Sequence, residues 1–212
     1  MSPWLAMLAF GAFHGLNPGM GWLFALSLGL QQRSGRVIWF SLLPIAAGHA
    51  AAVIAVVLLV LAGLHYVSLE LLRWLTAAAL LGLGSYKLFN YYRHPRWVGM
   101  KVGSLDLLWW SFLMATAHGA GLMLVPALLG VAGGAAGHHG HTGPVSSASG
   151  AMLLAVALHT LSMLLVMGSC AWLVYRRFGL AVLRQKWINF DLVWALALLL
   201  VGGIALLMAI AG

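Results

Sequence analysis

Residues 13–22 read FHGLNPGMGW and interrupt a hydrophobic segment that is otherwise long enough to cross a membrane as one helix. Pro18 has no N–H, and its ring collides with the carbonyl four residues earlier, which belongs to His14. The three glycines of this stretch let the chain unwind or let another helix approach. We therefore expect a first helix that is broken at its middle, with the backbone oxygen of His14 left unpaired beside its side chain.

The composition is that of an integral membrane protein. Of the 212 residues 63% are hydrophobic and only 7% are charged, and the mean hydropathy is +1.01. Water-soluble domains of this length do not normally reach such values. The N-terminal segment lacks a basic region before its apolar stretch, so we expect it to be a retained helix and not a cleaved signal peptide. The sequence predicts a single integral membrane domain over residues 1–212.

Apolar runs recur along the whole chain, separated by short stretches with Gly, Pro, Ser or charged residues. They predict an all-α protein with six transmembrane helices. The expected spans are about 4–30, 37–64, 70–90, 105–132, 150–175 and 190–211.

The basic residues are distributed unevenly between these spans. Ten of the eleven follow spans one, three or five, and Arg73 is the exception. By the positive-inside rule those connections are cytoplasmic, which places both termini outside. We expect a protein of the bacterial inner (cytoplasmic) membrane, in contact with the lipid bilayer. The positive charge then reports topology, and no nucleic-acid partner is expected.

The two halves of the chain share a pattern of histidines. Spans one and four carry HisGly pairs at His14 and His118, each with a proline further along, and spans two and five carry His49 and His159. Three helices per half insert with opposite orientation, so this pattern predicts a 3+3 inverted repeat. The first repeat would cover about 1–92 and the second about 104–212.

Buried ionisable side chains in a bilayer are costly and often mark ion pathways or cofactors. A single such histidine is more often a packing residue, but four at similar depth favour one shared site. The glycines and Pro126 after His118 predict a second break, in span four. Further oxygen and sulfur ligands are spaced to share these faces. The candidate metal ligands within the membrane are His14, Asn17, His49, His118, His159, Met114, Met163 and Ser162.

A histidine-rich stretch between spans four and five, about 133–149, is expected to form an outer loop. Its Gly and Ser content cannot bury a core, and its histidines make it a loose binder of Ni²⁺, Cu²⁺ or Zn²⁺, or simply a solvated linker. The residues concerned are His138, His139 and His141.

Acidic residues number only three, Glu70, Asp106 and Asp191, and none falls in the middle of a span. Mg²⁺ and Ca²⁺ prefer several oxygen ligands, so they are poor candidates, whereas imidazole and thioether suit Ni, Co, Cu or Zn. Nucleotide-binding and hydrolase motifs are absent, as is a CxxC pair, so no standard enzyme activity is expected.

The residues His14 with Asn17, Gly48 with His49, and the 138–141 tract give the chain a resemblance to a known family. It resembles the small nickel/cobalt permeases of the NicO type, within the lysine-exporter-like superfamily. In that family the first-helix histidine is followed four and five residues later by aspartate and histidine; Pro18 and Gly19 stand there in this chain. The resemblance implies a transporter whose site here lacks the anionic ligand.

Three functions follow as expectations. The first is a secondary transporter of a transition-metal cation through a histidine-lined midplane site, with possible proton coupling because imidazole binds metal only when neutral. The second is a membrane haem protein with bis-histidine ligation, or an intramembrane metalloenzyme. The third is a structural or assembly subunit whose histidines only join helices. A homo-oligomer and an accessory membrane subunit both stay open.

Overall fold

The computed structural model describes residues 2–90, 103–136, 144–177 and 190–211, and in these ranges the chain is helical with short connections. The first half contains α1 (Pro3–Leu16), the short 3₁₀ helix η1 (Pro18–Met20), α2 (Trp22–Gln31), α3 (Gly35–Tyr66) and α4 (Leu69–Asn90). The second half contains α5 (Ser104–Ala117), α6 (Ala120–Ala136), α7 (Pro144–Arg177) and α8 (Phe190–Ile210). The all-helical fold class is confirmed.

Three described helical segments are long and apolar enough to cross a membrane: Gly35–Gly63, Gly150–Arg177 and Leu192–Ile210. A fourth crossing results if α5 and the Ala120–Val131 part of α6, which meet at a bend of 67°, are taken together. The helix α4 does not join this group; it occupies the expected third span but carries Glu70, Arg73 and Lys87. Large apolar side chains are exposed on most helices, including Phe40, Leu59, Leu105 and Leu200. Such a surface suits a lipid environment.

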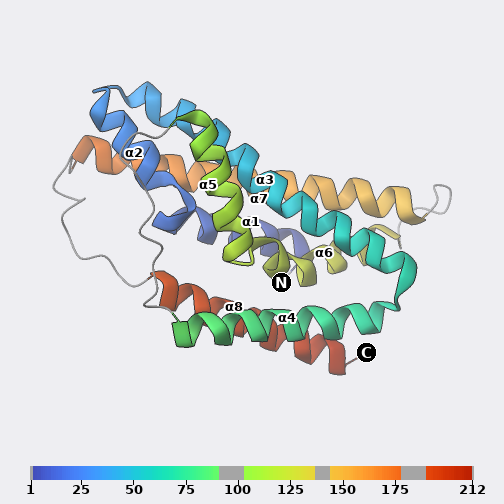
Figure 1. The fold of residues 1–212 in the computed structure, drawn as a ribbon. Helices are drawn as coiled ribbons and strands as arrows, with labels where there is room; N and C mark the ends of the chain where they lie inside the picture. Colours follow the sequence, from blue (N-terminus) through green and yellow to red (C-terminus); the bar gives the residue numbers. More distant parts are fainter. Residues whose placement is uncertain (1, 91–102, 137–143, 178–189, 212) are drawn as a thin grey trace.

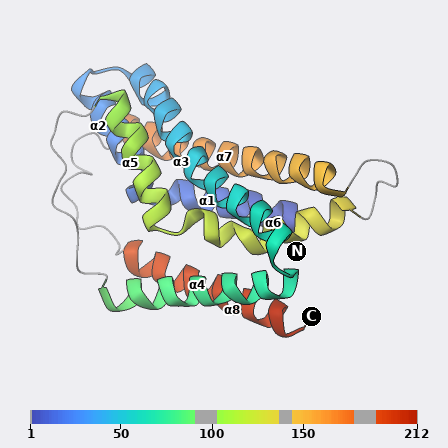
Figure 2. The same ribbon diagram turned by 45° about the vertical axis from the view of Figure 1, so that its right-hand side comes forward.

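The helices pack in pairs that join the two halves of the chain. The main partner of α1 is α7, the main partner of α5 is α3, and α4 lies along α8 (Figures 1 and 2). In both views α1 and α6 lie between α3 and α7 on one side and the α4/α8 pair on the other. The α2–α3 turn, the end of α4 and the end of α7 lie at one end of the molecule, and the α3–α4 turn and the end of α8 lie at the opposite end (Figure 1).

Close helix contacts explain several glycines. A Cβ on Gly11 of α1 would overlap the main-chain oxygen of His159 on α7, and a Cβ on Gly48 of α3 would overlap that of Leu108 on α5. Small residues permit this approach, which is how helices associate without a hydrophobic driving force between them. Each interface also has one interhelical serine bond. Ser162 donates to the Leu8 carbonyl at 2.9 Å, and Ser111 donates to the Ile45 carbonyl at 2.8 Å.

The first span is broken as its sequence predicts. The residue before a proline is driven to extended backbone, and Asn17 has φ −70° and ψ 118°, which ends α1 at Leu16. Gly21, at φ 124°, then allows α2 to begin. The expectation of an unpaired His14 carbonyl is wrong, because the N–H of Asn17 donates to it at 3.2 Å. The tightened last turn recovers the bond that Pro18 cannot make.

The second break lies between α5 and α6. The helix α5 ends at Ala117 with His118 as its C-cap, and Gly119 has φ 66°, a left-handed conformation that favours glycine. Pro126, in contrast, lies inside α6 and does not end it. Helix also covers both ends of the stretch expected to form the outer loop, since α6 continues to Ala136 and α7 begins at Pro144. His138, His139 and His141 lie outside the described residues.

Candidate metal centre in the membrane core

Three histidines from three helices meet in the core. His14 of α1, His49 of α3 and His159 of α7 are at most 1% exposed. Their ring centroids are 4.9 Å apart for His14 and His159, 5.6 Å for His14 and His49, and 5.5 Å for His49 and His159. We call these three residues the histidine cluster. The cluster joins residues that are 35 to 145 positions apart in the sequence, so only the tertiary fold creates it.

Main-chain carbonyls fix the ring tautomers. The Nδ1 of His14 lies 2.6 Å from the Phe10 carbonyl and the Nδ1 of His159 lies 3.2 Å from the Met7 carbonyl. A carbonyl only accepts hydrogen bonds, so each Nδ1 carries the proton. In a neutral ring each Nε2 then holds a lone pair. The neutral form is the less costly one here, because a buried charge without a partner is strongly disfavoured.

The Nε2 atoms of His49 and His159 are 3.3 Å apart. Because the His159 Nε2 holds a lone pair, the proton between them belongs to His49, which donates. The Nε2 of His14 is buried and has no hydrogen-bond partner. A buried polar atom without a partner costs roughly 1–3 kcal/mol, so it calls for an explanation such as a ligand or a water.

The fourth histidine lies apart from the cluster and is linked to it by Trp194 of α8. The Trp194 ring contacts His14 edge to face at a centroid distance of 4.6 Å and His118 at 5.5 Å. Its Nε1 donates to the His118 carbonyl at 2.6 Å, which satisfies a main-chain oxygen at the second helix break. Phe13 stacks on the same indole at 5.2 Å. His118 itself repeats the His14 arrangement, since its Nδ1 donates to the carbonyl four residues earlier, that of Met114.

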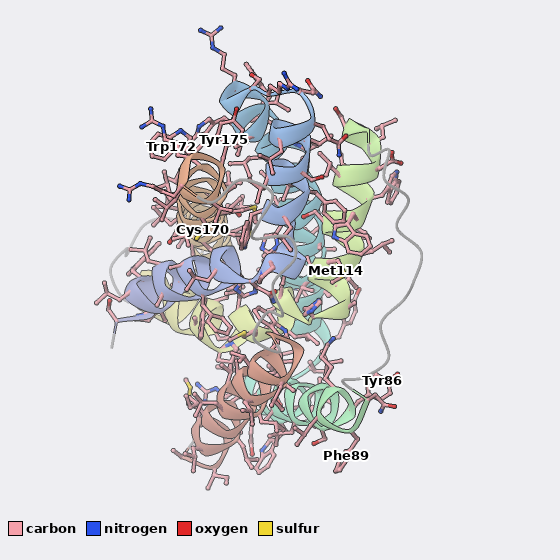
Figure 3. All side chains as sticks on the ribbon, turned by 90° about the vertical axis from the view of Figure 1, so that its left-hand side faces the viewer. Tyr86, Phe89, Met114, Cys170, Trp172 and Tyr175 are labelled. Atoms are coloured by element: carbon pink, nitrogen blue, oxygen red, sulfur yellow. The ribbon has the colours of Figure 1, made fainter. Side chains whose placement is uncertain are left out.

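The remaining predicted ligands have varied surroundings. Asn17 is buried, and its Oδ1 accepts from the Gly19 N–H at 3.0 Å, so it caps η1. Met163 is fully buried one turn after His159, whereas Met114 is half-buried between α5 and the α1–α2 segment (Figure 3). The hydroxyl of Ser162 is engaged with the Leu8 carbonyl. These four residues stay predicted ligands, and the histidine cluster has the strongest geometry.

The sequence did not single out Trp194. Trp194 is the fifth residue of α8, near the helix end where interfacial tryptophans usually lie, so its position in the sequence gives no signal of this role. Two further residues, Met20 and Met167, share the buried apolar cluster that contains Met163 and Trp194. Sequence reasoning had no basis for singling out these two residues, because methionine in an apolar helix is usually an ordinary packing residue.

As placed, the described side chains form no ready metal-ligand group of three or more His, Cys, Asp or Glu residues. In the cluster the lone pair of the His159 Nε2 is occupied, because it accepts a hydrogen bond from the His49 Nε2. The two acids whose side chains the structure describes, Glu70 and Asp106, are exposed, and Asp106 accepts a hydrogen bond from the N–H of Gly103. The centre is therefore built of neutral groups. Comparison with known protein families, with curated proteins and with solved structures finds no match to this chain.

Proposed function

We propose that this chain is a permease for a transition-metal cation, which binds in the membrane core within the cluster of His14, His49 and His159. The observation that carries the proposal is the convergence of three buried imidazoles, one of them with an unpartnered Nε2. Imidazole nitrogens are the preferred protein ligands of Zn, Cu, Ni and related ions. Ionisable groups in the interior of a membrane protein are rare and usually have a function.

An inverted repeat is part of the proposal. Each half supplies a broken helix with a histidine at the break, a long helix with a buried histidine, and one further helix. If the two halves are related by a twofold axis, α1 corresponds to α5, α3 to α7, and α4 to α8. The axis then converts the α1–α7 contact into the α5–α3 contact, and it passes between α4 and α8. Rocking of one half against the other would expose the cluster to each side in turn. We count α1 with α2, and α5 with α6, as one broken crossing each, which gives six.

The orientation follows from charge. Arg33, Arg36, Arg176 and Arg177 lie at the end of the molecule formed by the α2–α3 turn and the end of α7. We assign that end to the cytoplasm of a bacterial inner membrane, and both chain termini to the outside. We also propose a relationship to the nickel/cobalt permeases, with the difference that the described metal ligands of this chain are neutral.

Cation binding requires a rearrangement of the cluster. The proton on the His49 Nε2 must leave or move to its Nδ1 before that nitrogen can bind a metal. A haem is not favoured by this geometry, because His49 and His159 contact each other directly and leave no space for a porphyrin between them.

Metal accumulation in cells tests the proposal. His14→Asn, His49→Gln and His159→Gln keep an amide donor in place of the ring, and we expect each to lose most of the accumulation or export of the transported metal. His65→Gln is the matched control, since His65 is exposed at the end of α3. Unaltered levels of Ni, Co, Cu and Zn in all three cluster variants, at equal protein in the membrane, would mean that the histidines only join helices.

A further inference from the structure

We propose that the cation is soft and monovalent, with Cu⁺ as its biological form, and that His49 and His159 hold it in linear coordination between their Nε2 atoms. This inference rests on the proposed function and names the substrate class of the same site. Three features of the core carry it: the relative direction of the two rings, the lack of a negative charge among the described side chains at the cluster, and the buried thioethers.

The two rings face each other end to end. Their centroids are 5.5 Å apart and their Nε2 atoms 3.3 Å apart, with an angle of 18° between the ring planes. The difference between the two distances is close to twice the distance from an imidazole centre to its own nitrogen. The N–H of the His49 Nε2 and the lone pair of the His159 Nε2 therefore point at each other nearly along one line.

A linear site forms from this arrangement with little movement. With metal–imidazole bonds of about 2.0 Å, two collinear nitrogens are about 4 Å apart, so the rings need only separate slightly along their common axis. A tetrahedral site needs both rings to turn, because its bonds converge on a point away from the line between the nitrogens. Two-ligand linear coordination is typical of Cu⁺ and Ag⁺ and foreign to Zn²⁺, Ni²⁺ and Co²⁺.

Charge favours the same ion. Of the three carboxylates, Glu70 and Asp106 are exposed and the side chain of Asp191 lies outside those that the structure describes, so no described anion offsets a cation at the histidine cluster. The cost of placing an ion in a medium of low dielectric constant rises with the square of its charge, and it is already large for one charge. A monovalent cation is thus far cheaper to bind between neutral imidazoles than a divalent one.

Buried thioethers are present in the same core of the protein. Met163 is fully buried one helical turn after His159, and Met20 and Met167 belong to the same buried cluster. Thioethers select Cu⁺ among the biological first-row metals. They would offer weak, exchangeable contacts to an ion that leaves the histidine pair, which suits transport better than a closed cage.

Binding to the purified chain in lipid nanodiscs tests the inference, with Ag⁺ as a redox-inert probe and Cu⁺ under anaerobic conditions. All proteins carry His138→Ala, His139→Ala and His141→Ala, which removes the histidine tract as a competing binder. We expect one bound Ag⁺ per chain, not displaced by excess Zn²⁺, Ni²⁺ or Co²⁺, and an X-ray absorption spectrum of two collinear imidazole nitrogens. His49→Gln and His159→Gln should each weaken binding by about 100-fold or more, since removal of a ligand costs at least what loss of its outer-shell partner does. His65→Gln should bind as the parent does.

Several results would overturn the inference. Displacement of Ag⁺ by a divalent ion, a spectrum of three or four ligands, or unchanged binding by the two pair variants each contradict it. The absorption spectrum is measured on the protein that keeps His49 and His159, so it tests the inference even if the two pair variants fail to fold. If Ni, Co or Zn accumulation depends on the histidine cluster, the permease proposal stands while the monovalent assignment fails. If no metal accumulation depends on it, both fail.

Discussion

His49 and His159 form a direct Nε2 to Nε2 hydrogen bond of 3.3 Å between α3 and α7, across 110 positions of sequence. His159 also donates through its Nδ1 to the Met7 carbonyl of α1 at 3.2 Å, across 152 positions. Through these two bonds His159 ties α7 to both α3 and α1. A change that separates these helices must therefore disturb the centre.

Gly48→Ala should destabilise the neighbouring interface between α3 and α5. The new methyl group would overlap the Leu108 carbonyl of α5 and lie 3.0 Å from the Phe112 nitrogen, and main chain cannot yield as a side chain does. We expect a loss of about 1–3 kcal/mol in unfolding free energy, the usual cost of overpacking. Thermal unfolding in detergent measures it. Gly82→Ala is the control, because nothing lies within 4 Å of its Cβ position; equal stability of the two variants would contradict the close packing.

Gly119→Ala should strain the second helix break. Gly119 has φ 66°, which costs a residue with a Cβ about 1–2 kcal/mol, and the methyl would also meet Leu83 Cδ2 at 2.5 Å. Gly119→Asn should cost less than Gly119→Ala, because asparagine tolerates this conformation better. Denaturation of the two variants beside Gly150→Ala, whose Cβ position is open, ranks them. A Gly119→Ala protein as stable as the Gly150→Ala protein would argue against the bend.

Trp194→Phe removes the donor to the His118 carbonyl but keeps an aromatic ring against His14 and Phe13. A buried carbonyl left without its partner should lower the unfolding free energy by about 1–3 kcal/mol. The same substitution at Trp109, which is 59% exposed, should have little effect. Melting temperatures of the two variants decide the matter, and the prediction fails if they are equal.

The interhelical serines should contribute separately. Ser162→Ala removes a bond between α7 and α1, and Ser111→Ala removes one between α5 and α3. Such bonds in membrane proteins stabilise by about 0.6 kcal/mol on average, and these two lie in different interfaces, so their effects should add. Ser27→Ala is the surface control, because its hydroxyl bonds only the exposed Gln31 in the described structure. Strong non-additivity in the double variant would indicate that the two interfaces are coupled.

Orientation in the membrane can be read by labelling. In a Cys170→Ala background, Tyr66→Cys at the α3–α4 turn should react with an impermeant maleimide on intact spheroplasts. Gln32→Cys at the α2–α3 turn should react only after the membrane is opened. Both positions are exposed in the structure and lie at opposite ends of α3. The reverse pattern would place the arginine-rich end outside and refute the assigned topology.

The sequence by itself determined the elements of this protein. Apolar runs predicted the helices because hydrophobicity acts locally along the chain. Pro18 predicted the first break, and the glycines and Pro126 after His118 predicted the second, because the backbone preferences of these residues are intrinsic; of the latter group, Gly119 has the left-handed conformation and Pro126 lies within α6. It also singled out His14, His49, His118 and His159, since a polar side chain within an apolar helix is conspicuous. The sequence did not predict that the His14 carbonyl is hydrogen-bonded. The tightened last turn of α1 brings the N–H of Asn17 to this oxygen.

The tertiary structure decided which of these residues meet. Spacing places a histidine on one face of its own helix, but only the packing of α1 on α7 and of α3 beside α7 brings three of the four together. Trp194, whose partners lie on α1 and at the α5–α6 break, links His118 to the cluster through its ring and its Nε1. The end-to-end direction of His49 and His159 is likewise a property of packing, because ring orientation depends on contacts between helices that no local pattern encodes.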